Sequence, residues 1–147
     1  MPRRLFSGVT EQAKAAKHRL DDARSLFKEQ RWRRTMYMAG YGVECSLKAK
    51  LMKRFRCWTL QELEDHLHAK NLLPGQFTIF THQLMLLLRL TGSAAVLQRD
   101  RGLWPQFVLV NEWLPAWRYS PDLGRREDAE DYLNAGTTMA KWIENNV

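Results

Sequence analysis

Three residues could form a polar group on an otherwise apolar helix. Tyr41, Glu44 and Lys48 follow one another at steps of three and four residues, which places them on one face of a helix. A buried carboxylate needs a partner, because an unpaired charge in an apolar interior is very costly. Lys48, one turn after Glu44, can supply that partner. The group is therefore either an ion pair that fixes the packing or the polar floor of a cleft for a nucleotide or RNA.

Arg118 and Tyr119 form a second candidate site, in a segment rich in aromatic residues. An arginine next to aromatic rings can bind a phosphate while a ring stacks on a base. In the alternative interpretation, the aromatic rings cover an end of the helix bundle and Arg118 pairs with a core carboxylate such as Glu44. The two interpretations are compatible, since a structural arginine can also line a cleft.

The histidines offer a third candidate. His82 lies near the start of a predicted helix, where a neutral ring can both donate and accept a hydrogen bond, in a ligand site or in a purely structural role. His66 and His68 are two residues apart and do not share a helix face, so we expect no metal site. The chain contains no P-loop, no dinucleotide-binding glycine fingerprint and no Gly-x-Ser-x-Gly motif. We therefore expect no cofactor, and we assign no catalytic residue.

Charge is distributed unevenly along the chain. The formal net charge is +7, and residues 1–58 hold 15 Lys and Arg against 5 Asp and Glu. Such a basic half attracts polyanions, including RNA and nucleotide phosphates. Arginines interleaved with Trp32, at positions 31, 33 and 34, suit RNA; a solvated surface is the alternative.

Apolar residues at steps of three and four predict the helices that must position these groups. We expect helices over residues 10–29, 32–57, 60–70 and 81–98, and a last helix that begins after Pro121-Asp122. A capping box at Thr59-Leu60-Gln61-Glu62 marks the start of the third. Gly40 and Gly42 weaken the second helix, so we expect close packing there against another helix or across a subunit interface. Residues 102–121 should form an ordered loop with a helical turn at 106–112.

The bulk features predict one cytoplasmic domain, residues 1–147, folded as a compact all-α helix bundle. Cys45 and Cys57 would lie about 18 Å apart on one helix, too far for a disulfide, which suits a reducing compartment. The most apolar stretch, residues 77–90, is too short to span a bilayer, and no signal-type apolar run follows the first residues. We expect no membrane anchor.

The second predicted helix resembles the central helix of the HEPN family, named for a nucleotide-binding domain of higher eukaryotes and prokaryotes. The similarity is carried by the run Tyr37-Met-Ala-Gly-Tyr-Gly-Val-Glu-Cys-Ser-Leu-Lys-Ala49. His18 and Asp22-Ala23 in the first helix, Thr81-His82-x-Leu84, and Trp117-Arg118-Tyr119 before the last helix match as well. The resemblance covers nearly the whole chain in order.

This resemblance implies a four- to five-helix up-and-down bundle that forms a homodimer and binds nucleotide or RNA. Many members are ribonuclease toxins, and many pair with a small nucleotidyltransferase. The nuclease branch needs an Arg followed after four to six residues by a His, and none of the four histidines here has that arginine. We therefore expect a non-catalytic binding module of a toxin–antitoxin or defence-type pair. The ligand site would be lined by Tyr41, Glu44, Lys48, His82, Arg118 and Tyr119.

Two other functions remain open at this point. One is a metal-independent ribonuclease with a non-standard site, in which His82 moves protons and Arg118 stabilises charge. The other is a dimeric adaptor whose basic face binds an acidic protein.

Overall fold

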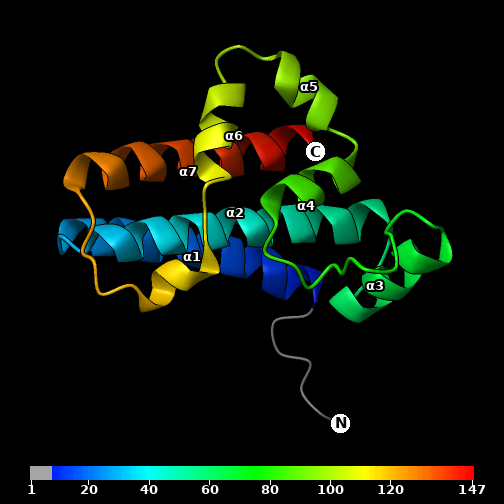
Figure 1. Ribbon diagram of the computed structural model, residues 1–147. Helices are drawn as coiled ribbons and strands as arrows, with labels where there is room; N and C mark the ends of the chain where they lie inside the picture. Colours follow the sequence, from blue (N-terminus) through cyan, green and yellow to red (C-terminus); the bar gives the residue numbers. More distant parts are fainter. Residues whose placement is uncertain (1–7) are drawn as a thin grey trace, which may run out of the picture.

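A computed structural model describes residues 8–147, and every regular element in this range is helical (Figure 1). An isolated bridge between Gly8 and Thr59 is the one β-type contact in this range. The elements are α1 (Val9–Lys28), α2 (Trp32–Arg54), α3 (Leu60–Ala69), α4 (Leu84–Thr91), α5 (Ala94–Arg99), α6 (Trp104–Val110), the 3-10 helix η1 (Pro115–Tyr119) and α7 (Arg126–Asn146). The predicted all-α class is confirmed.

Three long helices, α1, α2 and α7, form the body of the molecule (Figure 1). Helix α1 runs antiparallel to α2, while α7 runs parallel to it. Contacts between α2 and α7 advance along both helices in the same direction: a Cβ on Gly136 would lie 3.3 Å from the Cβ of Ala39, and further along Lys50 Nζ donates to the carbonyl of Glu144 at 2.7 Å. The lysine thereby satisfies a carbonyl that the end of α7 leaves without an intrahelical partner.

Small residues in α2 allow its neighbours to approach closely. A Cβ on Gly42 would lie 3.0 Å from Leu20 Cγ and 3.2 Å from the carbonyl oxygen of Ala16, both in α1. The expected close approach of another helix is therefore confirmed at Gly42, within one chain, whereas the side chain that approaches Gly40 is Trp113, which lies between α6 and η1. Helix α2 is central, as predicted: α1, α3, α4, α7 and η1 all pack on it. One hydrophobic cluster contains side chains from all seven α-helices.

The third long helix expected at residues 81–98 does not form as one piece. Helix α4 begins only at Leu84, after Thr81 Oγ1 has accepted a hydrogen bond from the backbone N–H of Gln83 at 3.1 Å. It ends at Gly92, whose φ of +78° is a left-handed conformation that glycine adopts without strain, and α5 then starts in a new direction.

The aromatic segment 102–121 is more helical than predicted. Residues 104–110 form helix α6, with Pro105 in its first turn, where a missing N–H costs no hydrogen bond. The prediction of a single helical turn at 106–112 was therefore too short and began too late. A separate 3-10 helix, η1, begins at Pro115.

With these changes the described residues hold seven α-helices, against the four or five expected. α1, α2 and α7 keep the relative directions that the first, second and fourth helices of an up-and-down bundle would have. Short helices replace the long third one.

Smaller boundary differences have local causes. Helix α2 ends at Arg54 and not at Cys57, because Arg56 adopts a positive φ of 54° that stops the helix. Both cysteines are buried and free, in line with the prediction of no disulfide. No helix within residues 8–147 combines the length and the apolar character that crossing a bilayer requires.

Candidate functional site

Glu44 lies in the centre of the structure with both carboxylate oxygens bonded. Its side chain is 4% exposed. Oε2 accepts a hydrogen bond from Lys48 Nζ at 3.3 Å, and Oε1 lies 2.6 Å from Nδ1 of His82. The predicted Glu44–Lys48 pair is confirmed. A buried carboxylate is tolerated here because each oxygen has a partner, and the buried Lys48 is paired in turn.

His82 connects this buried pair to solvent. The residue lies in the loop before α4, its side chain is 50% exposed, and its ring meets Trp113 edge-on with 5.6 Å between the ring centroids. A carboxylate that accepts from Nδ1–H selects the tautomer in which Nε2 carries a lone pair. Nε2 has no hydrogen-bond partner among the described residues. The arrangement therefore gives an oriented imidazole with one nitrogen free for a ligand or a proton.

Glu64 of α3 holds the loop that carries His82. Its Oε2 accepts hydrogen bonds from the backbone N–H of Ile79 at 2.6 Å and from Thr78 Oγ1 at 3.0 Å, and its Oε1 lies 3.0 Å from His68 Nε2. Burial raises the pKa of Glu64, but the hydrogen bonds from Ile79, His68 and Thr78 outweigh it and lower the pKa overall. The loop is thus fixed at one point by Glu64 and at another by Glu44.

An aromatic cluster of Tyr37, Tyr41 and Trp113 packs beside His82. Trp113 packs directly on Gly40: a Cβ there would lie 2.1 Å from Trp113 Cδ1, so glycine is required for this approach. The indole Nε1 donates to the carbonyl of Tyr37 at 3.0 Å. Tyr41 meets Trp113 edge-on, and the guanidinium of Arg19 lies 5.1 Å from the Tyr41 ring centroid. Trp113 therefore contacts both His82 and Tyr41, and Arg19 of α1 lies against the Tyr41 ring.

Burial is the largest cause of the pKa shifts of Tyr41 and Cys45, two neighbouring side chains of α2. It raises the pKa of the Tyr41 hydroxyl, and the nearby Cys45 and Glu44 raise it further. Burial likewise raises the pKa of the Cys45 thiol to about 12. Both side chains therefore stay protonated near neutral pH.

Arg118 and Tyr119 lie elsewhere than the prediction placed them. The alternative that paired Arg118 with Glu44 is wrong, because Lys48 and His82 already occupy both oxygens of that carboxylate. Arg118 is exposed on η1, its guanidinium lies 5.6 Å from the Tyr119 ring centroid, and Tyr119 is 79% exposed. Of the six predicted site residues, Tyr41, Glu44, Lys48 and His82 come together, while these two project into solvent.

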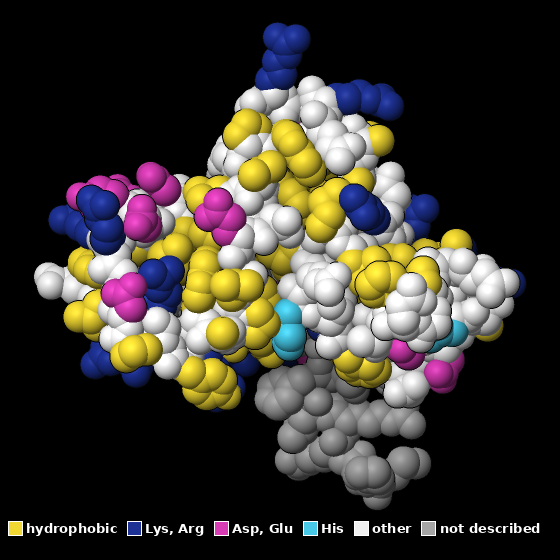
Figure 2. Space-filling view, in the orientation of Figure 1, with side chains coloured by type: hydrophobic (Ala, Val, Ile, Leu, Met, Phe, Trp, Pro, Cys, Tyr) yellow, Lys and Arg dark blue, Asp and Glu magenta, His cyan; other side chains and the backbone are white. Residues whose placement is uncertain are grey.

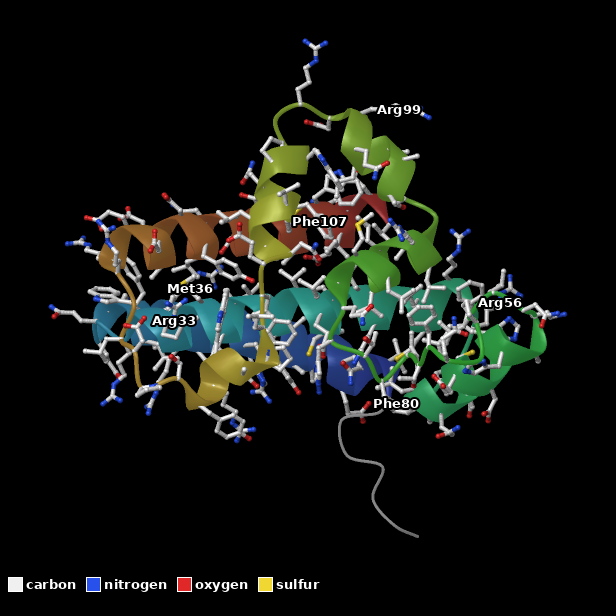
Figure 3. All side chains as sticks on the ribbon, in the orientation of Figure 1. Arg33, Met36, Arg56, Phe80, Arg99 and Phe107 are labelled. Carbon is white, nitrogen blue, oxygen red and sulfur yellow. The ribbon has the colours of Figure 1, made fainter. Side chains whose placement is uncertain are left out.

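The arginines at the start of α2 lie next to η1. Arg33 pairs with Asp122 at 3.3 Å, and its guanidinium lies 5.3 Å from the Trp117 ring centroid (Figure 3 labels Arg33 and its neighbour Met36). Together with Arg31, Arg34 and residues 120–123, Arg33 lines a cavity of about 190 Å³. The exposed Arg34 has no ion pair within residues 8–147. Basic groups from distant parts of the chain therefore gather around η1.

The space-filling view shows how charge is arranged on the face that carries these groups (Figure 2). Hydrophobic and uncharged side chains fill the middle of this face, with a histidine side chain surfacing between them, and the Lys, Arg, Asp and Glu side chains lie mainly around the edge. Four of the five acidic residues of α7 lie in its first turns, where Glu127, Asp128, Glu130 and Asp131 are exposed. Within residues 8–147 no three His, Cys, Asp or Glu side chains converge to hold a metal ion.

Three contributors to this site were not predicted. Trp113 belongs to the aromatic segment that was expected to cover an end of the bundle or to stack on a ligand, whereas its ring lies against His82. The only sequence signal for the Trp113 contact was Gly40, since a glycine inside a helix indicates that another group approaches the helix closely there. Glu64 and Arg19 carried no signal, because both act on residues far from them in the chain.

Comparison of the chain with protein-family models, with curated proteins and with solved structures gives no significant match.

Proposed function

We propose that this protein is a HEPN-like module that binds a phosphate-bearing ligand, a nucleotide or RNA, on the face that carries His82 and η1. The observation that supports it most directly is His82 itself. The buried Glu44 orients the imidazole through Nδ1, while Nε2 has no hydrogen-bond partner within residues 8–147 and the side chain is half-exposed. A protonated ring held in this way offers one directed, charge-assisted hydrogen bond to a phosphate oxygen.

The groups around η1 supply the other contacts in this proposal. Arg118 and Arg34 are exposed and have no ion pair among residues 8–147, so they can bind phosphate without breaking an existing bond. The exposed ring of Tyr119 offers a surface on which a base can stack. Glu44 and Lys48 then act beneath the surface and fix His82 in position.

Binding of a fluorescein-labelled, single-stranded RNA oligonucleotide, measured by anisotropy at several salt concentrations, tests this proposal. We expect Tyr119→Ala to weaken binding about tenfold, because base stacking on an aromatic side chain contributes about 1–3 kcal/mol. Arg118→Ala should reduce the slope of log K against log salt by about 0.7, because one phosphate of the RNA is then no longer neutralised by the protein. His82→Ala should weaken binding as well.

Arg99→Ala is the matched control, because Arg99 is exposed on α5 at the far end of the molecule from η1 (Figure 3). If Arg99→Ala weakens binding as much as Arg118→Ala, the attraction is a property of the net charge and the proposed site is wrong. Absence of any binding to RNA, ATP or GTP would remove the function as a whole.

Metal-independent RNA cleavage is the second candidate function, and the 2.6 Å contact between His82 and Glu44 favours it. A histidine oriented by a carboxylate can act as a general base. Nε2 would take the proton of a ribose 2′-hydroxyl, the 2′-oxygen would bond to phosphorus, and the 5′-oxygen would leave and take a proton from water. The product would be a 2′,3′-cyclic phosphate, with no change of oxidation state.

Incubation of labelled RNA with the protein in EDTA separates the two candidates. Cleavage that stops in His82→Ala and persists in Arg99→Ala would assign the enzyme. Intact RNA together with salt-sensitive binding would assign the non-catalytic module.

The HEPN resemblance leads us to include two protein partners in the proposal, a second copy of this chain and a small nucleotidyltransferase. Exposed apolar side chains next to the site support a protein contact there: Phe80 lies two residues before His82, and Leu114 follows Trp113 directly (Figure 3 labels Phe80). Light scattering after size-exclusion chromatography should give twice the chain mass, and Leu114→Glu should shift it toward the monomer. A monomer at all concentrations would remove the homodimer.

A further inference from the structure

A second, larger cavity lies between the three long helices. It measures about 530 Å³ and is lined by residues of α1, α2 and α7. Its α2 residues include Ser46, Ala49 and Lys53, and none of Tyr41, Glu44 and Lys48 lines it. The cavity is therefore a separate feature from the His82 site. The three helices that form it run alongside one another (Figure 1).

The floor of this groove is apolar and made largely of small residues. The short side chains leave this cavity open as a groove between the helices, and no aromatic residue lines the groove. The apolar lining residues are Ala13, Ala16 and Leu20 of α1, Ala49 of α2, and Ala140 and Ile143 of α7.

The rim of the groove is cationic. Five Lys or Arg residues line it against two acids, Asp21 and Glu144. Two of the cations are already engaged: Arg24 pairs with Asp21 at 2.9 Å, and Lys50 donates to the Glu144 carbonyl. The remaining three, Lys17, Lys53 and Lys141, are exposed and have no hydrogen bond or ion pair within residues 8–147.

The apolar floor and the cationic rim together favour one kind of binding partner over the others that a groove could hold. A second copy docked groove to groove through a two-fold axis would place the same cationic rim on both sides of the interface, and like charges oppose such an interface. RNA would satisfy the lysines, but the lining offers no ring on which a base could stack. A helix with an apolar stripe between acidic flanks matches both the floor and the rim, in the way that amphipathic helices bind in grooves.

We propose that the groove between α1, α2 and α7 is a docking site for an acidic amphipathic helix of a partner protein. The helix would place aliphatic side chains between Ala16, Ala49 and Ala140, and its Glu or Asp residues would pair with Lys17, Lys53 and Lys141. This site is independent of the ligand face around His82, so the chain would bind a phosphate ligand on one side and a protein on another.

Binding of three labelled synthetic peptides to the full chain tests the proposal. The first is a 20-residue helix with Leu at i, i+3, i+4 and i+7 spacing and Glu on both flanks. The second keeps the Leu residues and replaces Glu by Lys, and the third keeps the Glu residues and replaces Leu by Gln. We expect the first peptide to bind, and the other two to bind at least tenfold more weakly.

Two variants locate the binding. Lys53→Glu reverses one charge of the rim, and Ala13→Trp fills the groove without a change of charge, because Ala13 is an exposed lining residue. Each should weaken the first peptide at least tenfold and leave RNA binding unchanged, whereas Arg99→Glu, with an equal charge change on α5, should leave the peptide affinity within about twofold. Circular dichroism checks that each variant is folded.

Several outcomes would overturn the proposal. Equal binding of the first and third peptides would show attraction by charge alone, and equal losses in Lys53→Glu and Arg99→Glu would show that the groove is not involved. Loss of RNA binding in Ala13→Trp, with no peptide bound by the wild type, would make the groove a nucleic-acid site. Loss of RNA binding in His82→Ala would bear only on the ligand site around His82 and η1. The ligand site and the helix-docking groove are therefore tested independently.

Discussion

At the scale of single residues, the candidate site is organised around one buried carboxylate with two different partners. Glu44 bonds a buried lysine with one oxygen and a half-exposed histidine with the other. The lysine compensates the charge, and the histidine carries the interaction to the surface. Removing the carboxylate would leave Lys48 charged, buried and without an acidic partner, which typically costs more than the intact pair contributes.

We therefore expect Glu44→Gln to lower the free energy of unfolding by about 3 kcal/mol, because it leaves a buried ammonium without its counter-charge. Glu44→Gln/Lys48→Met should recover at least half of that loss, since no charge then stays buried. Urea denaturation followed by circular dichroism measures both. If the double variant is less stable than the single one, Lys48 contributes through its packing and not through the pair.

At the scale of elements, a loop and not a helix presents the candidate site. Helix α4 begins two residues after His82, so no helix terminus holds the imidazole. The path of the loop is fixed by hydrogen bonds that its backbone and Thr78 donate to Glu64, a residue of α3. Helix α3 is in turn capped by Thr59, whose hydroxyl accepts a hydrogen bond from the backbone N–H of Glu62 at 3.1 Å, as the capping box predicted. The short helix thus acts as a support for the loop.

The Glu64 contacts predict a pH dependence of stability. The pKa of Glu64 is lowered in the folded state, so its contribution is complete above the unfolded pKa, about 4.3, and is lost as the pH falls through the lower folded pKa. Glu64→Gln should cost about 1–3 kcal/mol at pH 7, in the range of a charged hydrogen bond. The difference between wild type and variant should shrink as the pH falls from 5 to 3, where the Glu64 carboxylate is protonated.

Urea unfolding of both proteins at pH 7, 5 and 3 measures this difference. Glu29→Gln is a suitable control, because Glu29 is an exposed carboxylate whose one ion pair, with Arg31, is also exposed. A difference that grows as the pH falls from 5 to 3 would contradict the assignment.

At the scale of the whole molecule, the fold separates two surfaces around one core. The face with His82 and η1 carries exposed apolar and aromatic side chains, and the groove between α1, α2 and α7 carries three free lysines. Helix α2 lies between them and contributes residues to both. Because the core cluster includes side chains from every α-helix, access to buried groups requires a large opening of the structure.

Cys45 reports on that opening. Its thiol is buried, and burial raises its pKa to about 12, so almost no thiolate is present at pH 8. In a Cys57→Ser background, we expect a thiol reagent such as DTNB to react at least a hundredfold more slowly with the native protein than with the protein in 8 M urea. A native rate close to the unfolded rate would show that α2 is open to solvent far more often than the packing implies.

The sequence by itself determined the features that depend on near neighbours in the chain. Apolar residues at helical spacing identified the long helices and the buried face of each, because a helix has a fixed period of 3.6 residues. The same period placed Lys48 within reach of Glu44. Gly42 indicated that another helix approaches closely, and Thr59 marked the start of α3.

Only the tertiary structure decided which distant groups meet. His82 lies 38 residues from Glu44, and the path of an irregular loop brings them together. Trp113 occupies the space above Gly40, and Arg118 projects into solvent although its type suited a partner for the buried acid. Periodicity states which side of a helix is buried, but the choice among partners follows from loop paths and packing, which no local pattern in the chain encodes.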